Sequence, residues 1–141
     1  MNILEVIRRK GSDVLSISPE ETVGELVNAL HEHNIGALVC MDGERLAGIV
    51  SERDIMHGLA QEGAALLDSP VSAIMTTAVE TCSESDDLER LAERMTELRI
   101  RHLPVVEEGK VTAIVSIGDV VKQRLEDLQA EREHLIDYVS S

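Results

Sequence analysis

The chain has 141 residues, which suffices for one compact domain or for two small halves that share a core. Its formal net charge of −14 disfavours non-specific binding of DNA or RNA, because nucleic-acid-binding surfaces are normally basic. We attribute the acidity to solubility. With one Tyr and no Phe or Trp, the core must be aliphatic, and a planar ligand would lie between aliphatic side chains.

Neither the two cysteines nor the first residues of the chain indicate a functional motif. Cys40 and Cys82 show no metal-binding or redox spacing, so we interpret both as small core residues; a redox role is the alternative. The first residues lack the pattern of a signal peptide, and no apolar run approaches the length of a membrane span. We therefore expect a cytoplasmic protein with no membrane contact.

A short amphipathic helix is expected over residues 2–10, with Gly11 as its C-cap. It precedes the first repeat, and we expect it to cover an exposed face or edge. The repeat itself has the order β-α-β-β-α. Its expected elements are a strand at 14–17, a helix at 22–34 with a capping box of Thr22 and Glu25, strands at 37–41 and 46–50 joined by a turn at Asp42-Gly43, and a helix at 52–60.

A second copy of this pattern follows, and it aligns without a gap on the first copy 65 positions earlier. Val79 matches Val14, Leu103 matches Leu38, and so on to the end of the repeat. Such a register indicates duplication of one folded unit. We predict an α+β fold in which two tandem repeats pack with pseudo-twofold symmetry and create two related clefts. The predicted organisation is an N-terminal helix at 1–11, repeats at 12–62 and 73–122, a linker at 63–72 and a C-terminal helix extension at 123–141.

The last helix is expected to run well past its counterpart in the first repeat. Its apolar residues follow helical spacing in an otherwise charged sequence: Val121, Leu125, Leu128, Leu135, Ile136 and Val139. A long helix with a narrow apolar seam needs a partner, and we favour the same helix of a second subunit. Packing on the protein's own body is the alternative.

Each repeat joins its last strand to its last helix through a hydroxyl and a carboxylate three residues apart: Ser51 with Asp54, and Ser116 with Asp119. The simplest interpretation is a capping box, since Ser-x-x-Asp commonly starts a helix. The alternative is a nucleotide site. The free N–H groups of a helix start suit a phosphate, and a carboxylate can accept hydrogen bonds from both vicinal hydroxyls of a ribose.

Basic residues near these junctions favour the nucleotide interpretation in so acidic a chain. Arg53 lies in the first junction, and Lys122 lies one turn beyond the second. Arg99, Arg101 and His102 precede a predicted core strand. An ordinary solvated helix end is the alternative explanation for this cluster.

Several motifs accompany the repeat: Ile35-Gly36-Ala37-Leu38-Val39, Gly48-Ile49-Val50-Ser51-Glu52-Arg53-Asp54, Met75-Thr76, Arg101-His102-Leu103-Pro104-Val105 and Ile114-Val115-Ser116-Ile117-Gly118-Asp119-Val120-Val121-Lys122. Together they resemble a tandem pair of CBS domains, also called a Bateman module, of the small stand-alone bacterial type. The resemblance covers roughly residues 12–122.

This resemblance implies a regulatory module that binds an adenine nucleotide or a related ligand (AMP, ADP, ATP, NAD or S-adenosylmethionine) between its repeats, commonly as a flat homodimer, with no obligatory cofactor. The Ser and Asp of each junction would contact phosphate and ribose, and backbone near the earlier strands would hold the base. The ligand-binding residues expected from the motifs and the resemblance together are Ser16, Ser18, Ala37, Ser51, Arg53, Asp54, Thr81, Arg99, Arg101, His102, Ser116, Gly118, Asp119 and Lys122.

The two junctions are not equivalent. Gly36, Gly48 and Arg53 of the first copy are matched by Arg101, Ala113 and Gly118. The first junction offers a guanidinium, whereas the second offers a glycine-opened helix start suited to close backbone approach. We therefore predict unequal affinities for the ligand.

An enzyme is not expected. The chain has no Gly-x-Ser-x-Gly, P-loop or His-Glu-x-x-His motif, and its five histidines make no metal spacing. Catalysis would rest on Asp54 or Asp119 as a general base with nothing to orient it, so no catalytic or metal-binding residue is predicted. A structural dimerisation module with empty clefts is a further possibility, supported by the long last helix. The regulated target would be a separate chain or the homodimer itself.

Overall fold

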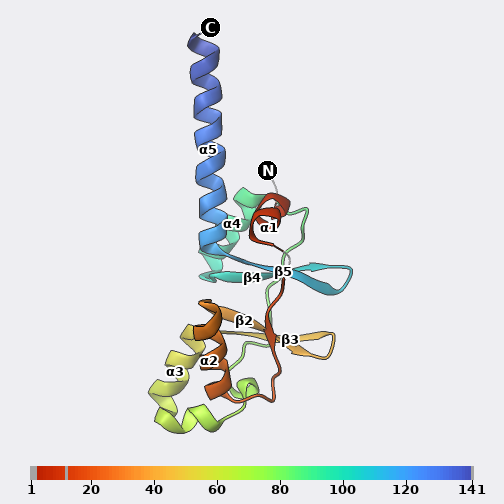
Figure 1. Ribbon diagram of the computed structural model, residues 1–141, viewed down its shortest axis with the longest axis vertical. Coiled ribbons are helices and arrows are strands. Elements are labelled where there is room, and N and C mark those ends of the chain that lie inside the picture. Colours follow the sequence, from red (N-terminus) through yellow and green to blue (C-terminus); the bar gives the residue numbers. More distant parts are fainter. Residues whose placement is uncertain (1–2, 12, 141) are drawn as a thin grey trace. The chain divides into compact units, whose positions relative to one another are not determined.

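A computed structural model describes residues 3–11 and 13–140 of the chain (Figure 1). The outermost positions of the predicted ranges, including the helix start at Asn2, lie outside these residues. The helices are α1 Ile3–Lys10, α2 Val23–His33, α3 Glu52–Glu62, α4 Leu88–Leu98 and α5 Ile117–Ser140, with short 3-10 helices η1 Gly63–Asp68 and η2 Val71–Ala73. The strands are β1 Ser16–Ile17, β2 Ala37–Asp42, β3 Arg45–Ser51, β4 His102–Glu107 and β5 Lys110–Ser116. The predicted mixed α/β class is confirmed.

The chain forms two compact units. The first unit consists mainly of residues 13–80 and contains the three-stranded sheet β1-β2-β3. Strand β1 runs parallel to β2, and β3 returns antiparallel after a two-residue loop in which Gly43 has a φ of 64°. The core of this unit includes Leu26 of α2, Leu38 of β2 and Val50 of β3. The capping box of Thr22 and Glu25 at the start of α2 is confirmed.

Residues beyond α3 pack back onto the first unit. Leu66 of η1 is fully buried beside α3. Val71 of η2 is fully buried in the same core cluster as Leu26, Leu38 and Val50. The backbone groups of Thr76 and Ile49 exchange two hydrogen bonds of 2.9 and 3.0 Å, which adds a short pairing to the edge of β3. The segment between the repeats is therefore part of the folded unit rather than an open connection.

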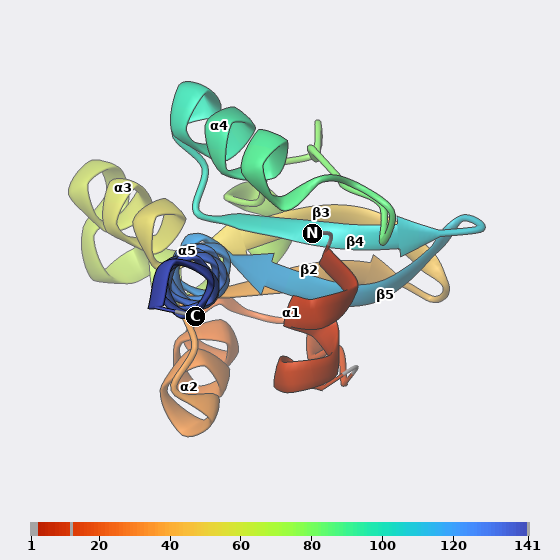
Figure 2. The ribbon, with the colours of Figure 1, turned by 90° about the horizontal axis from the view of Figure 1, so that it is seen from above.

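The second unit combines α1 with most of residues 81–140. Ile3 and Val6 of α1 are buried in one core cluster with Leu91 of α4 and Leu103 of β4. Arg9 forms an ion pair with Glu126 of α5, and α1 lies beside β5 in both views (Figures 1 and 2). The helix that precedes the first repeat in the sequence thus completes the core of the second.

The first strand of the second repeat is reduced to a single bridge between Cys82 and Val105. The match to residues 14–17 predicts a longer strand here. The difference has a local cause, because Pro104 stands where the first repeat has Val39. Proline has no N–H to donate, so the ladder that accompanies Ser16–Ile17 in the first unit cannot extend past Cys82 in the second.

Helix α5 projects well past the rest of the second unit (Figure 1). Its first turns contact α1 and α4, where Val120 and Gln123 are buried, whereas all residues from 128 to 140 are exposed. Among the described residues, no helix is both long enough and apolar enough to cross a membrane.

Both cysteine thiols are expected to be unreactive in the folded protein. Burial raises the pKa of Cys40 to about 11 and that of Cys82 to about 12, and the charges of Asp54 and Asp86 add to these shifts. Because the thiolate is the reactive form, reaction with a disulfide reagent at pH 8 should be slower than in the unfolded chain, by roughly a hundredfold at Cys40 and roughly a thousandfold at Cys82. Rapid modification of either thiol under native conditions would contradict their interpretation as core residues.

Candidate functional site

The first junction is a capping box at the start of α3. The Ser51 hydroxyl accepts a hydrogen bond from the Asp54 backbone N–H at 3.4 Å, and Asp54 Oδ2 accepts from the Ser51 backbone N–H at 2.8 Å. The same carboxylate oxygen also accepts from the Ser51 hydroxyl at 3.1 Å. Both side chains are half-buried, so the hydroxyl and the carboxylate are held together at the helix start without being sealed from solvent.

The second junction repeats this geometry at the start of α5. Asp119 Oδ2 accepts from the Ser116 backbone N–H at 2.9 Å, and the Ser116 hydroxyl accepts from the Asp119 backbone N–H at 3.1 Å. The sequence-based capping interpretation therefore describes both junctions. A cap and a ligand site are compatible, since the same bonds fix the positions of the polar groups.

In each unit the start of a central strand is tied to the junction. Ala37 lies directly across the sheet from Ser51, and the Glu52 N–H donates to the Gly36 carbonyl at 3.0 Å. The second unit has the corresponding bond from the Ile117 N–H to the Arg101 carbonyl at 2.8 Å. The structure thus brings together the strand start and the helix start that the sequence assigned to one site.

The basic residues of the predicted sites lie at the surface. Arg53, Arg101 and Lys122 are exposed, whereas His102 at the start of β4 is half-buried. Arg99 is also exposed, and it is the C-cap of α4 with a φ of 56°, where its backbone N–H donates to the carbonyls of Met95 and Thr96. Its position is explained by helix termination, which leaves its side chain available as a cation near the start of β4.

The residues of the first strands differ between the units. Ser16 is an exposed residue of β1 that pairs with Val39, two positions along β2 from Ala37, and the Ser18 hydroxyl accepts from the Glu20 N–H at 3.3 Å. Ser18 lies on the far side of Ser16 from Ala37, so the structure does not place it beside the first junction.

In the second unit the carbonyl of Thr81 accepts a hydrogen bond from Arg94 Nη1 at 2.7 Å. Arg94 did not enter the sequence-based site. The sequence did contain an indication, because Arg94 aligns with Ala29 of the first repeat and so adds a cation that the first repeat lacks. The neighbouring Ser83 hydroxyl donates to Glu107 at 2.7 Å, and this bond, with that from the Glu84 N–H, holds the pKa of the Glu107 carboxyl below its usual range. Near this strand, where backbone groups were expected to bind the adenine base, the Thr81 carbonyl and the Glu84 N–H are instead bonded to the side chains of Arg94 and Glu107.

Gly48 and Gly118 each differ from the matching residue of the other repeat, and their surroundings differ. A Cβ at Gly48 would lie 2.7 Å from the Thr76 carbonyl oxygen and 2.9 Å from Met75 Sδ, so this glycine permits the close packing of residues 75–76 on β3. A Cβ at Gly118 would meet only the Ser116 hydroxyl, at 3.6 Å. Packing therefore explains Gly48 but not Gly118, which keeps the start of α5 open.

Each junction offers a carboxylate and a hydroxyl at a helix start, with an exposed cation nearby, Arg53 in the first unit and Lys122 in the second. Within the described ranges, no group of three or more His, Cys, Asp or Glu side chains could hold a metal ion. A small polar ligand with both hydroxyl donors and negative charge matches these groups.

Comparison with known proteins gives the family. A model of the CBS domain matches residues 5–61 and 71–126. The chain belongs to the CBS-domain family. It is 32% identical to a mitochondrial CBS domain-containing protein of Arabidopsis thaliana over 97% of this chain and 71% of that protein. The predicted tandem CBS pair is confirmed by the two matches.

Solved structures of CBS-domain proteins share this fold. One from Agrobacterium tumefaciens is 42% identical with a TM-score of 0.86, covering 88% of this chain and 99% of that one. A CBS domain pair solved in complex with 5′-methylthioadenosine and S-adenosyl-L-methionine is 25% identical with a TM-score of 0.78, covering 87% of this chain and 98% of that one.

Proposed function

We propose that this protein is a regulatory module, not an enzyme, that binds an adenine nucleotide or a related adenosyl ligand such as AMP, ADP, ATP, NAD or S-adenosylmethionine. The observation that carries the proposal is the duplicated junction, in which a carboxylate and a hydroxyl stand together at a helix start. The CBS domain pair that holds two adenosyl compounds supports this ligand class.

Asp54 and Asp119 are the residues to which we assign the ribose. Asp54 Oδ2 accepts from the N–H and the hydroxyl of Ser51, so Oδ1 is the atom that we assign to the ribose diol. A hydrogen bond to a charged acceptor contributes about 1.5–3 kcal/mol. Loss of the charge should therefore lower affinity by about 10- to 100-fold.

The phosphate groups would lie at the helix starts. Ser51 and Arg53 offer a hydroxyl and an exposed guanidinium in the first unit. Ser116 and Lys122 offer a hydroxyl and an exposed ammonium in the second, where Gly118 leaves room for close approach to the backbone. Because Arg53 has no counterpart in the second junction and Arg94 has none in the first unit, we propose unequal affinities for the two sites.

A thermal-shift panel with AMP, ADP, ATP, NAD and S-adenosylmethionine tests the proposal. A ligand present at 100 times its Kd stabilises the native state by about 2.7 kcal/mol, which corresponds to a rise in Tm of several degrees. Asp54→Asn and Asp119→Asn should each reduce the shift, because asparagine keeps an oxygen for the capping bond but loses the charge. Calorimetric titration should show two unequal classes of site.

The matched control is Glu25→Gln at the start of α2. Thr22 and Glu25 form the same type of capping box, with bonds of 3.1 and 3.3 Å, but lie outside the proposed site. This variant should leave the ligand-induced shift unchanged. The proposal is wrong if none of the five compounds shifts Tm, and the site assignment is wrong if both Asn variants keep the full shift.

A second function is favoured by the exposed apolar residues of α5, namely a structural dimerisation module whose junctions serve only as helix caps. It predicts no ligand response together with a stable homodimer. If ligands do bind, we propose that they act through a homodimer or on a separate target protein. Small-angle scattering profiles that are identical with and without saturating ligand would exclude a change in homodimer shape as the signal.

A further inference from the structure

Arg94 of α4 holds the backbone at the first strand of the second unit. Its Nη1 atom donates a hydrogen bond of 2.7 Å to the Thr81 carbonyl, and its side chain is half-buried. Burial and the charge of Asp86 raise the pKa of the Cys82 thiol, whereas the charge of Arg94 lowers it. The guanidinium therefore lies close to this strand and not only at its edge.

The first unit has no equivalent of this bond. Ala29 of α2 stands at the position that matches Arg94, and Ser16 of β1 matches Thr81. Ala29 is half-buried and packs against the core of the first unit. Because its side chain is a methyl group, it has no donor for the Ser16 carbonyl.

A second side chain adds to the contrast between the units. In the second unit Glu107 Oε1 accepts hydrogen bonds from the Ser83 hydroxyl and the Glu84 N–H, each of 2.7 Å. In the first unit the matching carboxylate, Asp42, pairs instead with Arg45 at 3.3 Å. The stretch at residues 81–84 is thus held at both ends by side chains from other elements.

This stretch lies across β4 from the second junction. Cys82 bridges Val105 in parallel pairing. The preceding Thr81 therefore lies beside Pro104, about 7 Å past the start of β4. The start of β4 is itself hydrogen-bonded to the start of α5. A base that extends from a ribose at Asp119 across the start of β4 would meet the Thr81 carbonyl.

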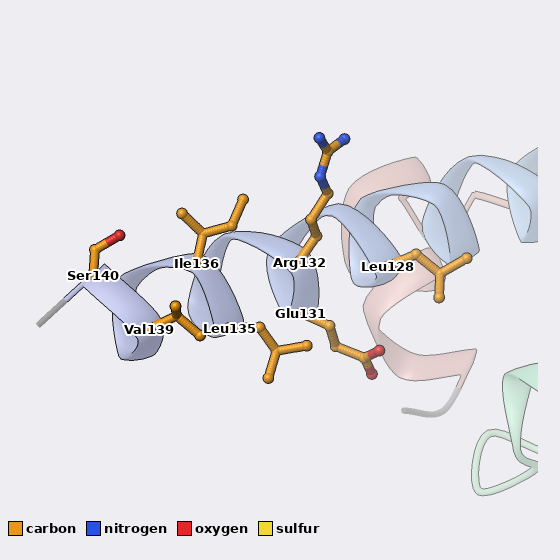
Figure 3. A pocket seen from close by; sticks show the side chains of 7 residues that line it. All are labelled: Leu128, Glu131, Arg132, Leu135, Ile136, Val139 and Ser140. Carbon is orange, nitrogen blue, oxygen red and sulfur yellow. The ribbon is translucent and has the colours of Figure 1, made fainter.

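The outer half of α5 offers a base no comparable place. The side chains that line its shallow hollow all belong to α5 (Figure 3). Every residue from 128 to 140 is exposed, so a base would be covered there on one side only. The backbone groups inside a helix are bonded to each other, which leaves none for the edge of the base.

We infer that Arg94 is a specificity-determining residue that makes the second unit the weaker site for an adenosyl ligand and the first unit the stronger one. The inference rests on the proposed function and deepens it. The exocyclic amine of adenine is a hydrogen-bond donor, for which a backbone carbonyl is a suitable acceptor. Arg94 already occupies an acceptor position of the Thr81 carbonyl and places a positive charge beside it, so a further donor is disfavoured. Ala29 does not compete in this way for the Ser16 carbonyl.

An NMR titration that resolves the two sites tests the inference, with AMP and S-adenosylmethionine as separate probes. The backbone amide signals of Asp54 and Asp119 report the first and the second junction. In the wild type the Asp54 signal should reach its midpoint at a ligand concentration about 3- to 10-fold lower, the effect of one neutral hydrogen bond. In Arg94→Ala, which copies Ala29, the Asp119 midpoint should fall by about this factor and the Asp54 midpoint should not change.

Two further variants serve as controls. Arg90→Ala removes the same charge from an exposed position one turn earlier in α4, so it should leave both midpoints unchanged. Arg94→Met keeps much of the aliphatic side chain but removes the donor. It should act like Arg94→Ala, and it repeats the test if alanine disturbs the packing of α4.

The possible failures can be told apart. A midpoint for Asp119 that stays the same or rises in both Arg94 variants overturns the inference, since Arg94 would then be indifferent to the ligand or would bind it. A wild type in which the Asp119 signal saturates first overturns it as well. If neither amide responds to AMP, ADP, ATP, NAD or S-adenosylmethionine, the proposed function itself is wrong.

Discussion

Replacement of Ile3 by alanine should lower the free energy of unfolding by about 2–5 kcal/mol, although this residue lies at the edge of the sequence. Ile3 is 0% exposed and belongs to the core cluster of the second unit, together with Val6 and residues of α4 and β4. Alanine would leave a cavity among side chains that are held by the sheet and cannot collapse freely. Denaturant unfolding followed by circular dichroism measures the loss.

Hydrogen exchange can show which unit depends on α1. In the Ile3→Ala variant, amide protection should fall first in α4, β4 and β5, because these elements share the core with Ile3. Protection in α2, β2 and β3 should be affected less, since their core is a separate cluster. The opposite order would contradict the assignment of α1 to the second unit.

Arg8→Ala is the control within the same helix. The Arg8 side chain is 72% exposed and its pair with Glu5 spans 3.7 Å, so its removal should change stability by about 0.5 kcal/mol at most. A loss below about 1 kcal/mol in Ile3→Ala, comparable to this control, would mean that α1 does not contribute to the core.

The parts of the fold that depend on neighbouring residues were predictable. The capping boxes at Thr22 and Ser51 were read from residues three positions apart, and both are present. The hairpin after β2 was predicted at Asp42-Gly43, and the loop lies one residue later, at Gly43 and Glu44. In each case the local sequence predicts the structure, because all the interacting groups belong to residues a few positions apart in the chain.

The parts that depend on distant residues were not predictable in the same way. The amphipathic pattern of α1 predicted that one side of the helix is buried, but it could not predict in which of the two cores that side is buried. Pro104 could have indicated that the first strand of the second repeat is short, because proline has no N–H to donate. The gapless alignment does not show this, since two repeats can align even where one residue has lost its hydrogen-bond donor. The bond from Arg94 to Thr81 joins residues 13 positions apart and needed the folded unit to be seen.

The elements expected to share a site were predicted to be neighbours, but the reason for one of the residues near it was not predicted. The strand starts and helix starts expected to share a site are hydrogen-bonded neighbours within each unit. The contrast between Gly48 and Ala113, however, was attributed to unequal ligand sites. The structure gives a different reason for it, because residues 75–76 pack against β3 at Gly48. Ligand selectivity need not be invoked at this position.

Gly48→Ala should therefore destabilise the protein by about 1–3 kcal/mol even though it adds a single methyl group. The Cβ would lie 2.7 Å from the backbone oxygen of Thr76, and relief requires residues 75–76 to move away from β3. That movement strains the two hydrogen bonds between Ile49 and Thr76. A fall in the denaturation midpoint without a change in the slope of the transition would report this loss.

Gly118→Ala separates this steric effect from the general effect of replacing glycine. Its Cβ would meet only the Ser116 hydroxyl, at 3.6 Å, so stability should be unchanged or higher. Adding Met75→Ala to Gly48→Ala should not restore stability, because the contact with the Thr76 carbonyl remains when the contact with the Met75 sulfur is removed. In the second repeat Ala113 of β5 stands at the position that matches Gly48, and the helix that follows β5 runs on to Ser140. Equal stability of Gly48→Ala and Gly118→Ala would show that the pairing of residues 75–76 with β3 is too loose to require glycine.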